Sequence, residues 1–349
     1  MSRTARASVI SVPDHPEAPA HARRTLAAIV ETTKPRITKL VVVTAGVGFA
    51  VSAVGSGGVG GASGRAWTLG EFLLAAAWCL LGTALSAAGA NALNQWMERD
   101  RDARMARTAT RPLPEGRLTP TQVFVAAAMM AGAGVGVLWI ASGVVAAAIA
   151  LTTIATYLLL YTPLKPVTSL ATLVGAVPGA LPPLIGWAAA DALTQAGARG
   201  NGGGGWWGGG NWSTLADPGA WTLFLIMFVW QIPHFLAIAW MYRDDYTRGG
   251  YRVLPAGDAT GSWTSAAILA WTLLLVPVTL APGVLMQAGP GPGYFVVALA
   301  TGLAFLALAL RLCRTRTREA ARATFLASII HLPVLLLVLV ADTAATALW

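Results

Sequence analysis

Long apolar stretches alternate with short polar segments along most of the chain. A helix needs about 20 predominantly apolar residues to cross the hydrocarbon core of a bilayer. Nine stretches approach this length: residues 37–54, 69–97, 123–140 and 144–161, a stretch that ends near residue 190, and residues 221–240, 266–286, 294–312 and 325–341. The pattern therefore predicts an all-α, polytopic membrane protein with about nine transmembrane helices.

The predicted domain organisation is simple. Residues 1–33 are polar and are expected to form a poorly ordered tail, whereas residues 34–349 are expected to form one intramembrane domain. A Gly/Trp-rich insertion at residues 191–219 is expected to be flexible, because glycine at this density leaves the backbone few restraints. Three prolines in the fifth span predict a kink, since proline removes a backbone donor. They are Pro178, Pro182 and Pro183.

The distribution of basic residues predicts the orientation in the membrane. The chain carries 24 Lys and Arg residues and a formal net charge of +9, although 56% of it is hydrophobic. If the N-terminus is cytoplasmic, every Lys and Arg except Arg65 and Arg199 lies on the cytoplasmic side, as the positive-inside rule expects. The C-terminus is then outside, and the protein is expected in the plasma membrane. The charge does not indicate a nucleic-acid partner, because the basic residues lie between apolar spans.

The segment from Asn91 to Arg117 concentrates charge at the end of the second span, with four acidic residues and six arginines. Within it, Asn94, Glu98 and Asp102 recur every fourth residue, so on a helix they form a stripe on one face. Oxygen-bearing side chains in this arrangement suit Mg²⁺, which usually keeps a phosphate or water ligand as well. The alternative is a solvated, arginine-rich loop that anchors a membrane helix.

Further charged side chains are expected on the same side of the membrane. Arginine suits phosphate because its guanidinium offers a planar fork of donors. The arginines placed to meet phosphate are Arg104, Arg107 and Arg111. Lys165, the acidic pair Asp244 and Asp245, and Arg248 lie in later cytoplasmic loops. Two acidic clusters could clamp a diphosphate through bridging Mg²⁺ while the basic residues neutralise the remaining charge. The alternative for the acidic pair is an ordinary loop.

Several motifs resemble those of a known family. The pattern N-x-x-x-[DE]-x-x-x-D followed by M-x-R-T-x-x-R-P-L-P-x-G-R is similar to that of the UbiA-type intramembrane prenyltransferases. Other stretches resemble one branch of that family, the protohaem IX farnesyltransferases (haem O synthases). These are T-K-P-R at residues 33–36, Y-T-P-L-K-P-V-T at 161–168, G-A-V-P-G-A-L-P-P-L-I-G-W at 175–187, and the run from Q-I-P-H-F to D-Y-x-R-G-G-Y-x-x-L-P at 231–255. The resemblance covers about residues 33–345.

The resemblance implies Mg²⁺-dependent transfer of farnesyl from farnesyl diphosphate to a vinyl group of protohaem IX, with water supplying a new hydroxyl, to give haem O. It implies catalytic roles for Asn94, Glu98, Asp102, Lys165 and Asp245, and metal binding by the first three with Asp244 and Asp245. Taken together with the charge pattern, the residues expected to contact substrate are Arg107, Arg111, Tyr161, His234, Asp244, Tyr246 and Arg248. The chain departs from the family in two places. Glu98 replaces the usual Asp of the wider family, and the second motif lacks a clean D-x-x-x-D, which leaves Asp245 as its ligand with Asp244 in support.

Two histidines and two cysteines lie in or beside the spans. His234 is a polar residue at membrane depth, where a functional role is the default hypothesis. We expect it to orient the porphyrin through a propionate or the iron; the alternative is a hydrogen bond to a neighbouring helix. For His331 the packing interpretation is favoured. Cys79 and Cys313 match no metal or redox spacing and are interpreted as packing residues.

Two other functions stay open. A related prenyltransferase that acts on an aromatic acceptor, such as a quinone precursor, would share the fold and the diphosphate residues, and only the branch motifs distinguish it. A transporter is the non-enzymatic alternative, but transporters tend to place polar groups near the midplane of repeated halves, whereas here the charge lies at one face. Besides its substrates and the lipid bilayer, the expected partners are haem A synthase or terminal-oxidase assembly proteins. The active site is expected to face the cytoplasm.

Overall fold

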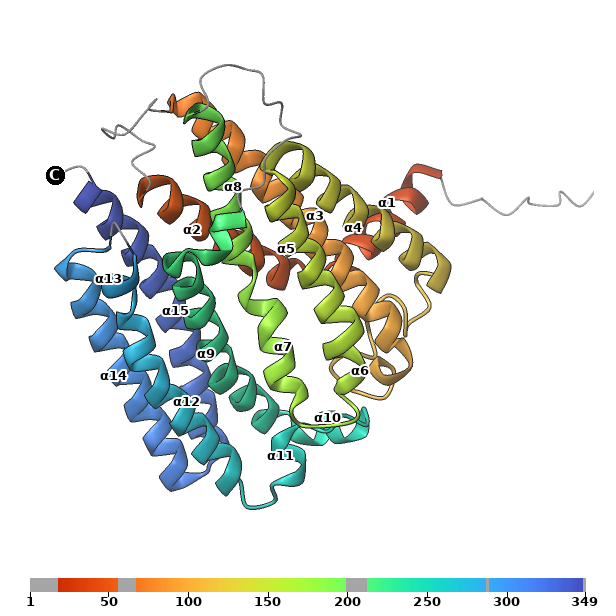
Figure 1. Cartoon of the computed structure of the whole chain (residues 1–349). Coiled ribbons are helices and arrows are strands. Elements are labelled where there is room, and N and C mark those ends of the chain that lie inside the picture. Colours follow the sequence, from red (N-terminus) through yellow and green to blue (C-terminus); the bar gives the residue numbers. More distant parts are fainter. Residues whose placement is uncertain (1–17, 56–66, 199–211, 287–288, 348–349) are drawn as a thin grey trace, which may run out of the picture.

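The computed structural model describes residues 18–55, 67–198, 212–286 and 289–347, and its secondary structure is helical (Figure 1). No strand occurs in these ranges. The elements are α1 (Ala18–Thr32), α2 (Pro35–Gly55), α3 (Leu69–Asp102), α4 (Pro120–Ser142), α5 (Val144–Ala155), η1 (Thr156–Tyr161), α6 (Thr162–Leu164), α7 (Ala171–Ala180), α8 (Pro182–Ala198), η2 (Trp212–Ala216), α9 (Pro218–Met241), α10 (Arg243–Arg248), α11 (Leu254–Gly257), α12 (Ser262–Leu280), α13 (Pro282–Leu285), α14 (Pro292–Thr315) and α15 (Arg318–Ala347).

Nine segments of the described chain are long and apolar enough to cross a membrane. They are α2, α3, α4, α5 with η1 and α6, α7 with α8, α9, α12 with α13, α14, and α15. The predicted all-α class and the predicted number of spans are therefore confirmed for these ranges. The spans pack as one bundle, in which α2 contacts α8, α3 contacts α4, and α9 contacts α7, α12 and α15 (Figure 1).

The fifth span is broken, as its prolines predicted. Helix α7 ends at Ala180 and α8 begins at Pro182, while Pro178 lies inside α7. The second half of this span packs tightly on α2. A Cβ atom added at Gly186 would lie 1.8 Å from the carbonyl oxygen of Ala45, so only glycine allows the two backbones to approach this closely. This contact fixes α8 against the first span.

The fourth span changes its helix type near its end. Helix α5 passes into the π-helix η1, where the backbone N–H and the hydroxyl of Thr162 both donate to the carbonyl oxygen of Tyr157. Short π-helical segments occur frequently at functional positions. Here η1 ends at Tyr161, four residues before Lys165, so the irregular turn leads directly into the predicted site.

Part of the segment predicted to form a poorly ordered tail, residues 18–32, forms helix α1. The reason is an apolar patch on this helix. Ala28 is 3% exposed and packs in a cluster with Leu113 and Leu118, which lie between α3 and α4. Residues 1–17 lie outside the described ranges.

The insertion at residues 191–219, predicted to be flexible, carries secondary structure at both of its ends. Helix α8 continues to Ala198, and η2 and the start of α9 occupy residues 212–219. Polar contacts explain this order. Asp191 accepts hydrogen bonds from Ser52 on α2 and from Thr214 on η2, which ties three elements together. Residues 199–211 lie outside the described part of the chain.

Helix α3 positions the candidate chemistry. It begins after Thr68, whose side chain forms a reciprocal capping box with Glu71, and it continues to Asp102. It is five residues longer than the predicted second span, and the whole stripe therefore lies within one helix.

Candidate functional site

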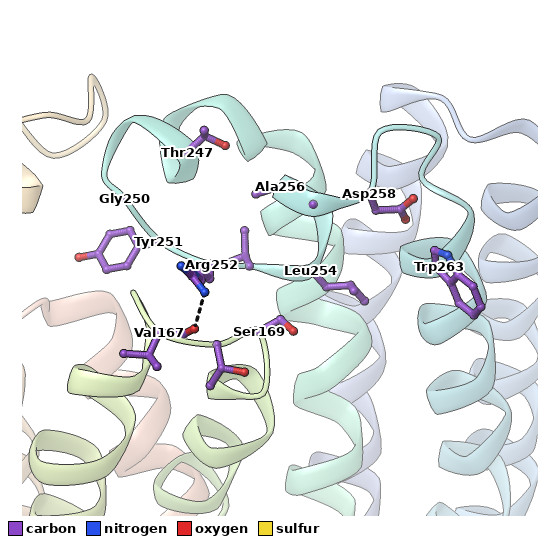
Figure 2. A pocket seen from close by; sticks show the side chains of 13 residues that line it. Val167, Ser169, Thr247, Gly250, Tyr251, Arg252, Leu254, Ala256, Asp258 and Trp263 are labelled. Carbon is purple, nitrogen blue, oxygen red and sulfur yellow. Dashed lines mark hydrogen bonds between the residues drawn. The ribbon is translucent and has the colours of Figure 1, made fainter.

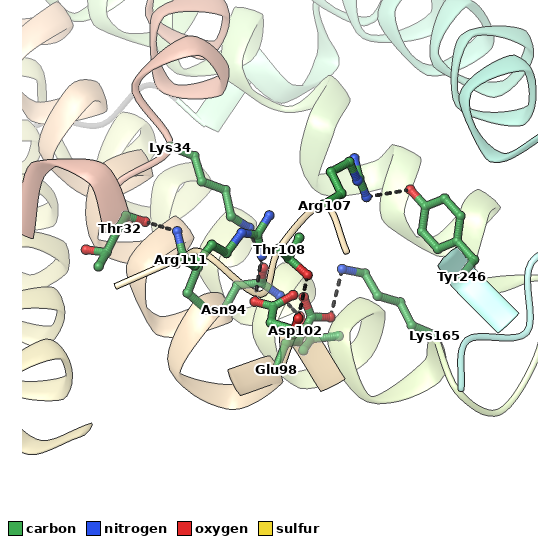
Figure 3. A network of polar contacts seen from close by, with 12 residues as sticks. Thr32, Lys34, Asn94, Glu98, Asp102, Arg107, Thr108, Arg111, Lys165 and Tyr246 are labelled. Carbon is green, nitrogen blue, oxygen red and sulfur yellow. Dashed lines mark hydrogen bonds and ion pairs between the residues drawn. The ribbon is translucent and has the colours of Figure 1, made fainter. Parts of the chain in front are cut away.

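The stripe on α3 is buried. Asn94, Glu98 and Asp102 are 0%, 5% and 1% exposed, and their side chains lie close to one another on one face of the helix (Figure 3). The alternative of a solvated loop is therefore wrong for these residues. Because buried charges are costly unless they are paired, each member of the stripe requires a partner.

Lysines from two distant segments supply two of these partners. Lys34, between α1 and α2, donates from Nζ to Oδ1 of Asn94 at 2.6 Å. Lys165, after α6, donates from Nζ to Oε1 of Glu98 at 2.8 Å. The amide nitrogen of Asn94 donates to the hydroxyl of Thr162 at 2.9 Å, which directs the amide oxygen towards Lys34. Two distant segments, the turn that holds Lys34 and the stretch from Thr162 to Lys165, thus meet at one face of α3.

The two lysines experience opposite electrostatic environments. Burial, followed by the nearby charge of Arg111, lowers the pKa of the Lys34 amine to about 7. Burial also opposes the charge on Lys165, but Tyr161 and Glu98 outweigh it and hold the pKa of that amine well above its ordinary value. The Lys165 amine also lies 4.4 Å from the centre of the Tyr161 ring, a cation–π contact.

Arg111 pairs with the last residue of the stripe. Its Nη1 lies 2.6 Å from Oδ2 of Asp102, and the hydroxyl of Thr108 donates to the backbone carbonyl of Asp102 at 2.8 Å. These bonds fold the loop after α3 back over the stripe. The second carboxylate oxygen of Asp102, Oδ1, is buried and has no hydrogen-bond partner among the described residues.

The short helix α10 contacts the same loop. Asp245 forms an ion pair with Arg248, and its carboxylate also accepts hydrogen bonds from the backbone of Ala106 and Arg107. The hydrogen bond from Arg248 is the largest cause that holds the pKa of Asp245 below its ordinary value. Nη2 of Arg107 lies 3.4 Å from the hydroxyl of Tyr246. The structure therefore brings the second acidic motif against the loop that covers the stripe.

Asp244 lies elsewhere. Its side chain is 85% exposed, and its ion pair is with Arg243 on the same short helix. It lines a separate surface hollow with Arg316 and Arg318 from the turn between α14 and α15. The structure thus does not bring Asp244 to the stripe, because successive residues of a helix point in different directions. Arg104 is exposed to solvent.

His234 faces another part of the bundle. Its Nδ1 lies 2.7 Å from the hydroxyl of Ser328 on α15, and its ring stacks on Trp230 and contacts Phe325. These are the contacts of the alternative interpretation, a histidine hydrogen-bonded to a neighbouring helix. His331 is likewise buried between α14 and α15, where its Nδ1 lies 2.9 Å from the hydroxyl of Thr301.

Sequence reasoning missed Lys34, Thr162 and Tyr251 as members of this site. The T-K-P-R motif was the available signal for Lys34. Tyr251 is 6% exposed, and its ring centre lies 5.8 Å from the amine of Lys165. It forms one wall of an open hollow of about 660 Å³ between the segment after α6 and the segment that leads to α12 (Figure 2).

The donor set of the stripe fits Mg²⁺. Within the described ranges no three His, Cys, Asp or Glu side chains form a metal-binding group. However, Mg²⁺ prefers oxygen ligands and usually takes only one or two carboxylates, together with phosphate and water. Glu98 and Asp102 supply two carboxylates and Asn94 an amide oxygen, and the unpartnered Oδ1 of Asp102 is an oxygen open to a cation.

Fold and site together define an all-helical intramembrane protein with a buried oxygen-donor stripe lined by Lys and Arg. The sequence pattern of the UbiA prenyltransferase family matches residues 41–332. The chain belongs to this family.

Individual relatives agree with this assignment. A protoheme IX farnesyltransferase from Solibacter usitatus is 39% identical over 308 residues, which are 88% of this chain and 95% of that protein. One from Koribacter versatilis is 37% identical, over 89% of this chain and 92% of that protein. Among solved structures, a digeranylgeranylglyceryl phosphate synthase has a TM-score of 0.66 at 15% identity, covering 92% of this chain and 99% of that one. A UbiA homolog from Archaeoglobus fulgidus bound to GPP and Mg²⁺ has a TM-score of 0.53 at 12% identity, covering 92% of this chain and 100% of that one.

Proposed function

We propose that this protein is a protohaem IX farnesyltransferase, which transfers farnesyl from farnesyl diphosphate to a vinyl group of haem b and so makes haem O. The observation that carries the proposal is the buried stripe of α3 with its three cationic partners, Lys34, Lys165 and Arg111. The named relatives, which are similar over 88–89% of the chain, support the choice of acceptor.

The cations around the stripe suit a diphosphate. A diphosphate carries several negative charges, and preorganised donors in a site shielded from water stabilise the charge that develops on a leaving group. Lys34, Lys165 and Arg111 come from three segments and would donate to its oxygens from different sides. Arg107, held against the rings of Tyr242 and Tyr246, would complete this ring of donors.

Asn94, Glu98 and Asp102 would hold Mg²⁺, with Asp245 as the proposed ligand from the second motif. When bound, Mg²⁺ supplies charge neutralisation to the diphosphate oxygens. The stripe also explains why basic side chains converge here: Lys165 and Arg111 pair with the carboxylates of Glu98 and Asp102, and Lys34 donates to the amide oxygen of Asn94. Asp244 is not a proposed ligand, because it lies away from the stripe.

The bond between farnesyl C1 and the diphosphate oxygen breaks, and C1 bonds to the terminal carbon of the vinyl group. The positive charge then lies on the neighbouring vinyl carbon, where one water adds, and the proton from that water leaves with diphosphate. A site within a helical bundle would restrict the access of water, which protects the carbocation from premature capture.

Several finer features belong to the same proposal. The positive-inside distribution supports a plasma-membrane protein whose site faces the cytoplasm. Haem A synthase or terminal-oxidase assembly proteins are the proposed partners. A haem contact of His234 stays a prediction, and unchanged haem binding by a His234→Ala variant would count against it.

A product assay tests the proposal. Purified protein would be incubated with protohaem IX, farnesyl diphosphate and Mg²⁺, and the extracted haem would be analysed by mass spectrometry. The expected result is a mass gain equal to one farnesyl group plus one hydroxyl group, because the added water loses a proton. If haem is unchanged while an aromatic acid acceptor becomes prenylated, the proposal is wrong and the protein is a sister prenyltransferase.

A further inference from the structure

The hydroxyl of Tyr251 is buried without a hydrogen-bond partner among the described residues. The residue is only 6% exposed. A buried hydroxyl without a partner is costly, and native proteins rarely leave one without a reason such as a ligand or an ion. The position of this hydroxyl therefore requires an explanation.

The chain around Tyr251 is built to hold the ring in place. A Cβ atom at Gly249 would lie 2.8 Å from Sδ of Met105, so glycine allows this turn to pack directly on the loop that follows α3. Gly250 has a φ of 73°, a left-handed conformation that glycine adopts without strain. The backbone N–H of Tyr251 then donates to the carbonyl of Tyr246 at 2.9 Å. The sequence R-G-G-Y thus serves to direct one side chain inward.

The Tyr251 hydroxyl points away from the open hollow, and its ring lies beside the amine of Lys165, which pairs with Glu98 of the stripe. In Figure 2 the hydroxyl is directed away from Leu254 and Trp263, which lie at the other end of the hollow. Burial raises the pKa of the phenol, and the next largest cause is the negative charge of Glu98. The phenol is therefore a neutral donor beside the stripe.

A second unpartnered atom lies at the same site, Oδ1 of Asp102. The charge of Asp102 also acts on the Tyr251 phenol, although the two groups do not hydrogen bond to each other. One group can donate and the other can accept, and each lacks a partner. A ligand that accepts from the phenol and carries a cation to the carboxylate would satisfy both, and a diphosphate with Mg²⁺ has this chemistry.

We propose that Tyr251 is a further substrate-binding residue, whose phenol donates a hydrogen bond to a phosphate oxygen of the prenyl diphosphate. This inference rests on the proposed function, because it assumes that the stripe binds a diphosphate.

The test removes only the hydroxyl. Tyr251→Phe keeps the ring that contacts Lys165 and walls the hollow. Because the hydroxyl has no partner in the free protein, its loss should leave the melting temperature of the ligand-free protein unchanged or slightly raised. Binding of inorganic pyrophosphate with Mg²⁺, measured by calorimetry in detergent micelles, should weaken by about tenfold, as expected when one hydrogen bond to a charged group is lost.

Tyr294→Phe is the matched control. Tyr294 is 0% exposed and donates its hydroxyl to the carbonyl of Thr279 at 2.7 Å, away from the stripe. This variant should melt at a lower temperature and bind pyrophosphate as the wild type does. The inference is overturned if Tyr251→Phe binds pyrophosphate with unchanged affinity, or if its only effect is a lower melting temperature. If the wild-type protein does not bind pyrophosphate with Mg²⁺, the proposed function itself falls.

Discussion

The pair formed by Lys165 and Glu98 gives a quantitative test of the site. The perturbation is Lys165→Met, which keeps an unbranched apolar side chain but removes the charge. The side chains of Lys165 and Glu98 are 20% and 7% exposed, and the bond between them is 2.8 Å long. Without Lys165, the Glu98 carboxylate loses its nearest cation in a site with little access to water.

The expected cost follows from this burial. Removing one partner of a fully buried ion pair costs about 3–5 kcal/mol, and because Lys165 is one fifth exposed we expect about 2–3 kcal/mol. Replacing both residues, in Lys165→Met with Glu98→Gln, removes the unpaired charge and should recover most of this loss. Mg²⁺ should raise the free energy of unfolding of Lys165→Met more than that of the wild type, because the Glu98 carboxylate of the variant has lost its lysine partner.

The assay is a double-mutant cycle of unfolding in mixed micelles, followed by the loss of helical signal. Arg117→Met is the control, because Arg117 and its two acidic partners, Glu31 and Glu115, have side chains 39%, 47% and 48% exposed. Such an exposed pair contributes at most about 1 kcal/mol. A buried, coupled pair is excluded if Lys165→Met lowers the free energy of unfolding no more than Arg117→Met does. It is also excluded if the loss in the double variant equals the sum of the losses in Lys165→Met and Glu98→Gln.

Three further predictions concern other contacts. Lys34→Met should weaken binding of farnesyl diphosphate with Mg²⁺ about tenfold or more, because it removes a donor at the stripe. Lys39→Met, on the exposed side of α2, should leave this affinity unchanged, and calorimetry measures the affinity of both variants. Gly186→Ala should destabilise the bundle by about 1–3 kcal/mol, whereas Gly132→Ala, where an added Cβ meets nothing within 4 Å, should not lower the melting temperature. Hydrogen bonds near α12 hold the pKa of Asp258 below its ordinary value despite burial. Its stabilising effect should be complete at neutral pH and lost as the pH falls below about 4, so wild type and Asp258→Asn should converge in melting temperature in acid.

The span pattern and the stripe could be predicted because each depends on short-range periodicity. Apolar runs of bilayer length define helices wherever they occur in a chain, and a spacing of four places side chains on one face of a helix. Asn94, Glu98 and Asp102 satisfy both conditions, and the structure confirms that they share one buried face. That they bind a metal stays a prediction.

Contacts between distant segments could not be predicted in the same way. Lys34 lies 60 residues before Asn94 in the chain, and only the fold brings the two together. Asp244 and Asp245 are neighbours in sequence, but α10 directs Asp244 to solvent and Asp245 to the loop after α3. The motif favoured Asp245 as the ligand, but only the fold shows that Asp244 lies away from the stripe. Tyr251 lies within the D-Y-x-R-G-G-Y motif, but the motif indicates no role for it, because the missing partner of its buried hydroxyl is visible only in three dimensions among the described residues.

The most direct test of the central claim compares two aspartates of one helix. Asp102 is 1% exposed and pairs with Arg111, whereas the side chain of Asp100, two residues earlier, is 79% exposed. Haem O formation from protohaem IX and farnesyl diphosphate would be measured for Asp102→Asn and Asp100→Asn. Asp102→Asn should lower the rate of haem O formation by about 10²-fold or more, the loss typical of a group that stabilises charge in the transition state. Asp100→Asn should stay within about twofold of the wild-type rate. Equal activity in the two variants would contradict the claim that the buried stripe is the active site.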